Sequence, residues 1–171
     1  IQEVENDFDI NFFPEGGSLI DNVSSTVAFK AVNLSGKGCD VTGELFSSSG
    51  DLITTFKSIH LGMGYFTLKP VPGISYTAIV KRSDGAIIET GLPESLPTGV
   101  TISAFATLDK KLFVTINTNE ESLPSLNGRN LDLSCSLPNL ISNITEIQIT
   151  SLVNNFLLSV DDFPNGIMRV T

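Results

Sequence analysis

The sequence contains no tryptophan, one histidine and two cysteines among its 171 residues. With so few thiols and imidazoles, it has neither a disulfide framework nor the CxxC or histidine-rich spacing that holds zinc. It also lacks an apolar run of roughly 18 residues, the length that a membrane-crossing helix needs. The chain is therefore not expected to depend on disulfides, structural zinc or a transmembrane helix.

Basic residues are also scarce. Lys and Arg number 10 against 19 Asp and Glu, which gives a net charge of −9. The basic residues are scattered, and an acidic surface repels a phosphate backbone, so nucleic acid is not an expected partner. The acidity is expected to serve solubility. Apolar residues make up 41% of the chain and charged residues 17%, a balance that indicates a folded protein.

Short alternating runs of apolar and polar residues are abundant. This period of two is typical of antiparallel strands with one buried face, and almost no segment shows the period of a helix. In the first half of the chain, the side chains expected to face a core are Phe8, Ile10 and Phe12; Val27, Phe29 and Ala31; Val41 and Leu45; Phe66 and Leu68; and Tyr76, Ala78 and Val80.

Turn residues separate these runs. Residues 35–38 (SGKG), 49–51 (SGD) and 84–85 (DG) each supply a glycine that tolerates positive φ between two apolar runs. About seven strands in about 90 residues, with turns roughly every 8–12 positions, are typical of a β-sandwich of the fibronectin-III or immunoglobulin-like kind. Residues 1–92 are therefore predicted to form one all-β, antiparallel sandwich module.

A segment with two prolines and two glycines follows at residues 91–99 (GLPESLPTG). No strand could pass through both prolines without losing ladder hydrogen bonds, so we predict a linker short enough to restrict the motion of its neighbours. Residues 99–171 are expected to form a second sandwich-like module, with a hairpin turn at Asp109 and Lys110. Its predicted strands are residues 100–106, 111–118, 130–136, 145–149 and 155–160, with Leu112, Val114 and Ile116 on one face and Leu131, Leu133 and Cys135 on another.

Both ends of the sequence read as cut. It begins with Ile1, and residues 166–171 read as the opening of a strand with no turn after it. We therefore expect a fragment whose second module is incomplete at its C-terminal end, because a sandwich needs a pair of sheets. Missing strands would leave an open sheet edge, and such an edge favours self-association.

Residues 12–20 (FFPEGGSLI) resemble the F-[FY]-P-E-G-G-x-L signature of macroglobulin-like, MG2-type domains. The signature also has a physical interpretation: Pro14 ends a strand, Gly16 and Gly17 allow a sharp reversal, and Leu19 returns to the core. The motif is thus expected to shape a corner of the fold without supplying chemistry. The resemblance continues in order through residues 27–31 (VAFKA), 36–43, 50–53, 60–66 (HLGMGYF) and 70–76, and it covers most of residues 8–80.

The form of these motifs is similar to that in large envelope proteins of Bacteroidetes-type bacteria, including TonB-dependent outer-membrane receptors. Residues 162–171 (DFPNGIMRVT) are likewise similar to the start of the following module in such proteins. The resemblance implies an exported protein of a Gram-negative bacterium, in the periplasm, in the outer membrane or at the cell surface. A macroglobulin-type protease inhibitor is the other parent that the family offers. Its Gly-Cys-Gly-Glu-Gln thioester is matched here only by Gly38 and Cys39, so the thioester and bait region would lie outside this sequence.

The candidate reactive side chains are His60, Cys39 and Cys135. His60 stands at a strand-to-turn transition and is expected to be structural or exposed, not the base of a nucleophile. Both cysteines fall in strand-like segments and are expected to pack as small apolar residues, with a bridge or a reactive thiol as the alternative. Residues 62–64 (GMG) lack the Lys-Ser/Thr of a phosphate-binding loop.

The aromatic, acidic and Asn-x-Ser/Thr patterns of the sequence do not indicate a ligand or modification site. Exposed aromatic residues are expected to be few, with Tyr65 and Tyr76 the only tyrosines, and this counts against a carbohydrate-binding platform. Nothing singles out a carboxylate pair for glycoside hydrolysis. The acidic pairs Asp7 and Asp9, Glu120 and Glu121, and Asp161 and Asp162 lack the spacing of a calcium loop, and the Asn-x-Ser/Thr triplets at Asn22, Asn33 and Asn143 are as frequent as chance predicts.

These observations predict a non-catalytic structural or interaction module of a larger cell-envelope protein. No catalytic residue, cofactor-binding residue or metal ligand is expected, and no cofactor. The expected partners are other domains of the same parent chain, or envelope proteins. The alternative is a module that binds a glycan or a peptide through its loops or an exposed sheet edge. Fold alone does not decide between them.

Overall fold

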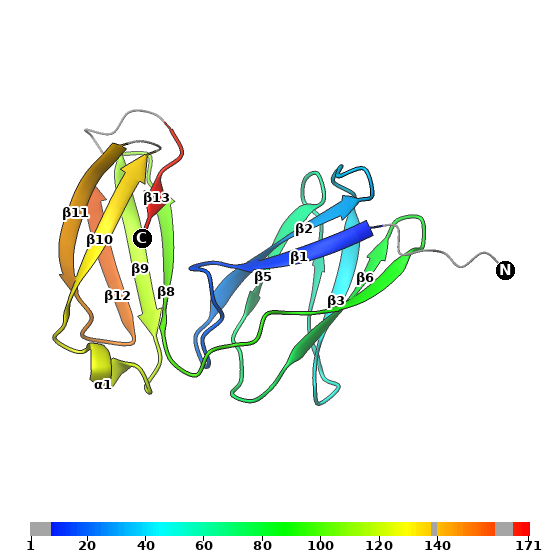
Figure 1. The fold of residues 1–171 in the computed structure, drawn as a ribbon, viewed down its shortest axis with the longest axis horizontal. Helices are drawn as coiled ribbons and strands as arrows, with labels where there is room; N and C mark the ends of the chain where they lie inside the picture. Colours follow the sequence, from blue (N-terminus) through cyan, green and yellow to red (C-terminus); the bar gives the residue numbers. More distant parts are fainter. Residues whose placement is uncertain (1–7, 138–139, 160–165) are drawn as a thin grey trace. The chain divides into compact units, whose positions relative to one another are not determined.

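A computed structural model describes residues 8–137, 140–159 and 166–171. The chain divides into two compact units, Ile1–Pro97 and Thr98–Thr171, which we call unit 1 and unit 2. Both are built from antiparallel sheets, which confirms the predicted all-β, sandwich-type fold (Figure 1). In the part of the chain that the structure describes, no helix has the length and apolar character that crossing a membrane requires.

Unit 1 is a sandwich of two sheets with strand orders β1-β2-β5 and β4-β3-β6-β7. Every neighbouring pair is antiparallel, so each sheet can keep one face in the core and one in solvent. The strands are β1 (Phe8–Pro14), β2 (Ser25–Asn33), β3 (Val41–Ser47), β4 (Leu52–Lys57), β5 (Met63–Leu68), β6 (Tyr76–Arg82) and β7 (Ile87–Gly91).

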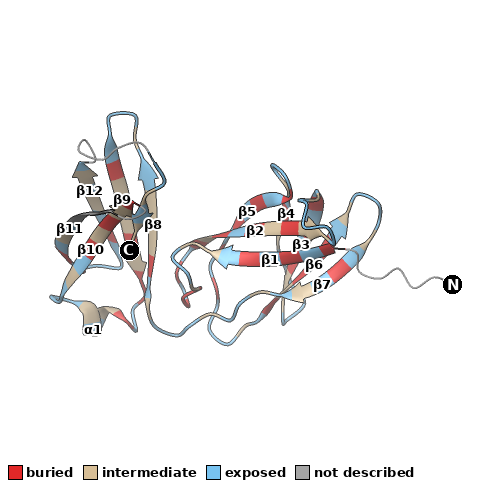
Figure 2. Cartoon of the chain, turned by 45° about the horizontal axis from the view of Figure 1, so that its top comes forward, coloured by how far each residue is buried: buried red, intermediate tan, exposed pale blue. Residues whose placement is uncertain are grey.

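The alternation of the sequence sets which side chains point into unit 1. Along β1, for example, Phe8, Ile10 and Phe12 are buried while the residues between them are exposed. Strands β2, β3, β5 and β6 repeat this alternation, which Figure 2 shows along the ribbons. All of the side chains predicted to face the core of this unit are buried. A period of two over a half-buried sheet explains the agreement.

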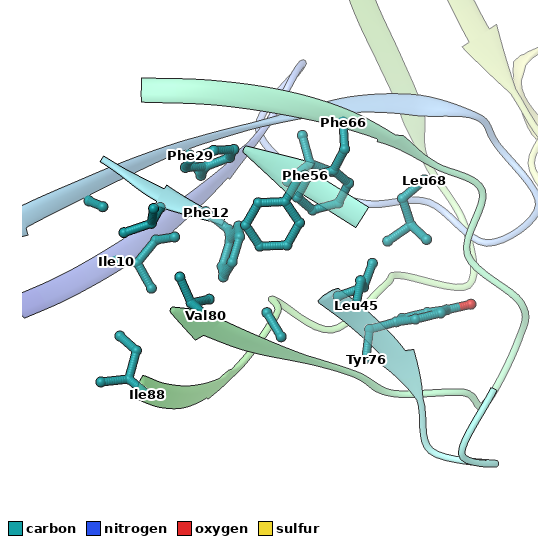
Figure 3. Close-up of a cluster of buried hydrophobic side chains, with 14 of the residues drawn as sticks. Ile10, Phe12, Phe29, Leu45, Phe56, Phe66, Leu68, Tyr76, Val80 and Ile88 are labelled. Carbon is teal, nitrogen blue, oxygen red and sulfur yellow. The ribbon is translucent and has the colours of Figure 1, made fainter. Parts of the chain in front are cut away.

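The middle of this core is a cluster of phenylalanine rings (Figure 3). Phe12, Phe29 and Phe66 come from the sheet β1-β2-β5, and Phe56 enters from β4 of the opposite sheet. The ring centroid of Phe56 lies 6.0, 4.9 and 5.0 Å from those of Phe12, Phe29 and Phe66. Offset and edge-on aromatic pairs at these separations are attractive beyond their buried area, so Phe56 holds the two sheets together.

The corner predicted at residues 12–20 is present. Pro14 is the last residue of β1, and Gly16 and Gly17 follow with φ of 84° and 96°. The chain then returns inward at Leu19, which has no exposed surface. The segment is therefore an architectural corner, as its residue types require.

Unit 2 consists of two three-stranded sheets with strand orders β12-β9-β8 and β11-β10-β13 in the described residues. The predicted hairpin joins β8 and β9, with Lys110 at φ 55° in its turn. Val114 of β9 and Leu133 of β10 lie in the core between the sheets. The elements are β8 (Val100–Ala106), β9 (Lys111–Thr118), α1 (Leu123–Leu126), β10 (Asn130–Leu137), β11 (Leu140–Gln148), β12 (Val153–Ser159) and β13 (Arg169–Val170).

Three elements of unit 2 differ from the prediction. Strand β11 begins at Leu140, whereas the predicted strand begins at residue 145. The short helix α1 was not expected; it follows a turn in which the Asn119 side-chain oxygen accepts hydrogen bonds from the Ser122 N–H and hydroxyl at 3.0 and 2.6 Å. Strand β12 begins at Val153, before the predicted start at residue 155, and includes Asn154, a polar residue in a buried site. Its amide side chain bonds backbone groups of Thr150 and Ser151. Residue 160 of that predicted strand lies outside the described residues, as do residues 161–165, which the sequence predicts to form a turn together with Gly166.

Most of the segment expected to be the linker is hydrogen-bonded to one unit or the other. In unit 1, the Leu96 N–H donates to the Leu19 carbonyl at 2.8 Å, and the Leu96 carbonyl accepts from Asp21 N–H at 2.9 Å. In unit 2, the Gly99 N–H donates to Ser122 Oγ at 2.8 Å, and the Gly99 carbonyl accepts from the Thr118 hydroxyl at 2.8 Å. Pro97 and Thr98 alone stand between these two anchored positions.

Candidate functional site

The outer face of the sheet β1-β2-β5 carries a row of three side chains that point away from the core. Phe13 pairs with Ala28, and Ala28 pairs with Tyr65, so the three residues lie side by side across the strands. Phe13 is 55% exposed and Tyr65 is 62% exposed. Because neighbouring strands stand about 4.8 Å apart, the two aromatic residues flank a gap roughly 10 Å wide with a methyl group as its floor.

This gap is part of a shallow groove of about 820 Å³ that runs along β2. The β5 side is extended by Met63 and Ile59, both exposed apolar side chains. Aromatic residues and methionine are enriched in the cores of protein interfaces. The groove is therefore the strongest candidate for a binding site in the described residues.

Polar groups stand at the two ends of this groove. Glu15 and Thr26 lie at one end, where the Glu15 N–H donates to the Thr26 carbonyl at 2.8 Å. His60 lies at the other end, next to Met63, which pairs with Lys30 on β2. Thr26 and Lys30 are four positions apart on β2, so the groove is roughly 13 Å long. Glu15 supplies the carboxylate among the lining residues.

A two-residue turn closes the histidine end. Leu61 and Gly62 have φ of 48° and 74°, and they connect His60 to Met63. Positive φ at both central residues fits the turns that join antiparallel strands, although leucine is an uncommon choice there. The Lys30 ammonium donates to the Leu61 carbonyl at 2.6 Å and so holds this conformation in place.

The predicted reactive residues do not form a catalytic arrangement. His60 is exposed in the groove, whereas Cys39 lines a separate hollow of about 470 Å³ with Arg82 and the residues 33–35. Burial raises the pKa of the Cys39 thiol above its ordinary value, with the nearby Arg82 charge acting in the opposite direction. A raised pKa keeps this thiol protonated near neutral pH, and the thiol is a poor nucleophile.

The two cysteines occupy different environments. Cys135 is buried within β10 in the core of unit 2, as predicted, and burial raises its thiol pKa. The prediction that Cys39 lies in a strand is wrong: it precedes β3 and is only partly buried. The backbone at Cys39 lies close to strand β2, where the Cys39 N–H donates to the Ala31 carbonyl at 3.2 Å.

Asp9 and Asn33 have structural partners, Glu120 and Glu121 are exposed, and several other candidates lie outside the described residues. The Asp9 carboxylate accepts from the Asn11 amide at 2.9 Å, and the Asn33 side-chain oxygen accepts from Ser35 and Lys37 in its own turn. Among the described residues, no three His, Cys, Asp or Glu side chains gather as a metal ion would require. Asp7, Asp161, Asp162 and the side chain of Asn143 lie outside the described residues.

Unit 2 also carries exposed aromatic and apolar side chains on an outer sheet face. Phe105 and Leu157 are the register partners of Phe113, and the rings of Phe105 and Phe113 are 5.2 Å apart. Phe105 is 60% exposed on the outer face of the sheet β12-β9-β8. Phe105 is therefore a useful reference for the exposed aromatic residues of the groove in unit 1.

No protein-family model matches this chain, and no curated protein matches it either. The macroglobulin-like resemblance of residues 12–20 and the segments after it therefore stays a prediction.

Sequence reasoning did not identify the groove. Phe13 interrupts the alternation of its strand by placing an aromatic residue at an outward position, and this was the available signal. Tyr65 lies 52 positions further along the chain and meets Phe13 only through the pairing of β2 with both strands. Such pairing cannot be derived from the period of one strand alone.

Proposed function

We propose that this chain is a pair of non-catalytic β-sandwich modules that hold apart, and present binding surfaces for, other parts of a larger cell-envelope protein. A TonB-dependent outer-membrane receptor of a Gram-negative bacterium is the parent that the macroglobulin-like motifs favour. The proposed location is accordingly the periplasm, the outer membrane or the cell surface. The partners would be other domains of the parent or neighbouring envelope proteins.

The observation that carries the spacing role is the short connection between the units. Leu96 is hydrogen-bonded in unit 1 through both its N–H and its carbonyl, and Gly99 is bonded in unit 2 in the same way. Of the residues between them, Pro97 has its φ held near −65° by its ring. Few backbone angles are left to vary, so the units are expected to reorient within a narrow range.

Ligand binding is the second candidate, and the groove between Phe13 and Tyr65 is the observation that favours it. A macroglobulin-type protease inhibitor is a less supported parent. Cys39 sits beside β3 with a raised pKa, and its surroundings offer no support for a thioester at this position.

The spacing role can be tested by nitrogen-15 relaxation of the whole chain. We expect the two units to give one common rotational correlation time, close to that of an 18.3 kDa body. A variant with eight Gly and Ser residues inserted between Pro97 and Thr98 is the control, because a flexible linker of that composition uncouples folded modules. Native units that tumble as independently as those of the insertion variant would overturn the spacing role.

A further inference from the structure

We propose that the groove of unit 1 binds an extended peptide segment in which a bulky apolar side chain stands within two residues of a Lys or Arg. The apolar side chain would enter between Phe13 and Tyr65 over Ala28, and the cation would meet Glu15. This inference does not depend on the spacing role of the connection between the units.

The width and floor of the groove define the first half of this ligand. Ala28 is flanked by larger side chains on both neighbouring strands, so the hollow above its methyl group accepts one side chain or ring. Aromatic residues of this kind anchor protein interfaces because they bury a large area at a small cost in conformational entropy. The length of the groove, roughly 13 Å, fits about four residues of extended peptide.

The charges at the groove define the second half. Glu15 is acidic and lies at one end, while the ammonium of Lys30 at the other end donates to the Leu61 carbonyl. The chain as a whole carries a net charge of −9, so a basic partner is attracted to this surface over longer distances as well. A second copy of the same acidic chain is opposed by the same charge.

The chemistry of the lining favours a peptide over a glycan. Phe13, Ala28, Ile59 and Met63 offer no strong hydrogen-bonding side chain, and between the two polar ends the Tyr65 hydroxyl is the polar side-chain group among the lining residues. A glycan needs many directed hydrogen bonds, whereas an apolar side chain needs only a dry contact. Pockets that bind apolar groups usually have an apolar lining, and a few polar groups in them fix the orientation of the ligand.

The test is selection of a phage-displayed library of random heptapeptides on the whole chain. We expect the selected peptides to be enriched in an aromatic or large aliphatic residue with Lys or Arg within two positions. Selection on Tyr65→Thr or Phe13→Thr should lose these peptides, and selection on Phe105→Thr should retain them. Phe105 is the matched control because it is a similarly exposed aromatic residue on a sheet face of unit 2.

A Glu15→Gln variant separates the two halves of the ligand. It should keep the apolar preference and lose the preference for Lys or Arg. For a selected peptide, the dissociation constant should rise at least fivefold in Tyr65→Thr and Glu15→Gln and stay within twofold in Phe105→Thr. Matching thermal melts would show that the variants are folded; Phe13, Tyr65 and Phe105 are exposed and Glu15 is partly exposed.

Several outcomes would overturn the proposal. They are no enrichment on the native chain, enrichment that Tyr65→Thr leaves unchanged, and peptides without a basic residue. Amide shifts at the groove that grow with protein concentration in the absence of peptide would point instead to a second copy. Shifts there with a panel of neutral oligosaccharides, but not with selected peptides, would point to a glycan.

Discussion

Gly62 and Ala31 are in direct backbone contact: the Ala31 N–H donates to the Gly62 carbonyl at 2.8 Å, and a Cβ on Gly62 would stand 2.3 Å from the Ala31 carbonyl oxygen. Gly38 lies beside the same contact, since its Cβ would come 2.0 Å from the Leu61 carbonyl oxygen. Gly38 and Gly62, one from each of the 36–43 and 60–66 motifs, therefore allow the close approach of these backbone segments.

We expect Gly62→Ala to destabilise unit 1 more than Gly73→Ala does. Both glycines have φ of 74°, so each substitution places alanine in the left-handed region at a cost of about 1–2 kcal/mol. A Cβ on Gly73 meets nothing within 4 Å, whereas one on Gly62 meets backbone, which should add about 1–3 kcal/mol. Urea unfolding of both variants measures the difference, and equal losses would contradict the crowding at Gly62.

A second glycine makes room for the aromatic cluster. Gly43 is the register partner of Phe56, and a Cβ there would approach the Phe56 ring to 2.2 Å. Gly43→Ala should therefore displace the ring and lower the free energy of unfolding by about 1–3 kcal/mol. Gly91→Ala is the control, because its Cβ would be 4.0 Å from its nearest neighbour. If Gly91→Ala proves as harmful by urea unfolding, the displaced ring is not the cause.

The stability of unit 1 should fall in acid partly through Asp84. Hydrogen bonds from the Arg82 side chain, helped by the Ala86 N–H, lower the pKa of this carboxyl to about 2. An unfolded aspartate titrates near pH 3.9, so the stabilising contribution is complete above about pH 4 and is lost as the pH falls to about 2. Asp84→Asn should flatten the decline of the urea midpoint between these values. An equally steep decline in the variant would show that Asp84 does not contribute.

The attachment of the segment from Leu92 to Leu96, called the strap below, to the rest of unit 1 should depend on a hydrogen bond of Ser95. Its hydroxyl donates to the buried Asp21 carboxylate at 2.5 Å, so Ser95→Ala should cost about 1–2 kcal/mol in unit 1. Hydrogen exchange should speed up at the Asp21 and Leu96 amides, whose acceptors lie in this strap and at Leu19, and not in unit 2. Ser49→Ala, in an exposed turn, is the control and should change neither amide. Unchanged exchange in Ser95→Ala would refute the role of this bond.

The sequence predicts the faces of single strands well, because a period of two depends on neighbours two positions apart. Phe8, Ile10 and Phe12 are buried for this reason, and Pro14 and Gly16 shape the corner that their backbone chemistry requires. The apolar/polar pattern failed where a polar side chain is buried and forms hydrogen bonds with the backbone. Asn154 is buried because its amide bonds nearby backbone groups, which an apolar pattern does not reveal.

The candidate site could not be predicted because it depends on contacts distant in the sequence. Phe13 and Tyr65 flank one groove only because β2 pairs with both β1 and β5. Strand order results from the packing of the whole core around Phe56, which no single segment encodes. The anchoring of Leu96 and Gly99 is similarly invisible in a segment that reads as a linker.

Residual dipolar couplings of the two units, measured together in one dilute aligned medium, test the central claim most directly. If the short connection holds unit 1 and unit 2 in a narrow range of orientations, both sets of amide couplings will fit a single alignment tensor of one magnitude. Two tensors whose magnitudes differ by a factor of two or more would mean that the units reorient freely, and the spacing role would be wrong.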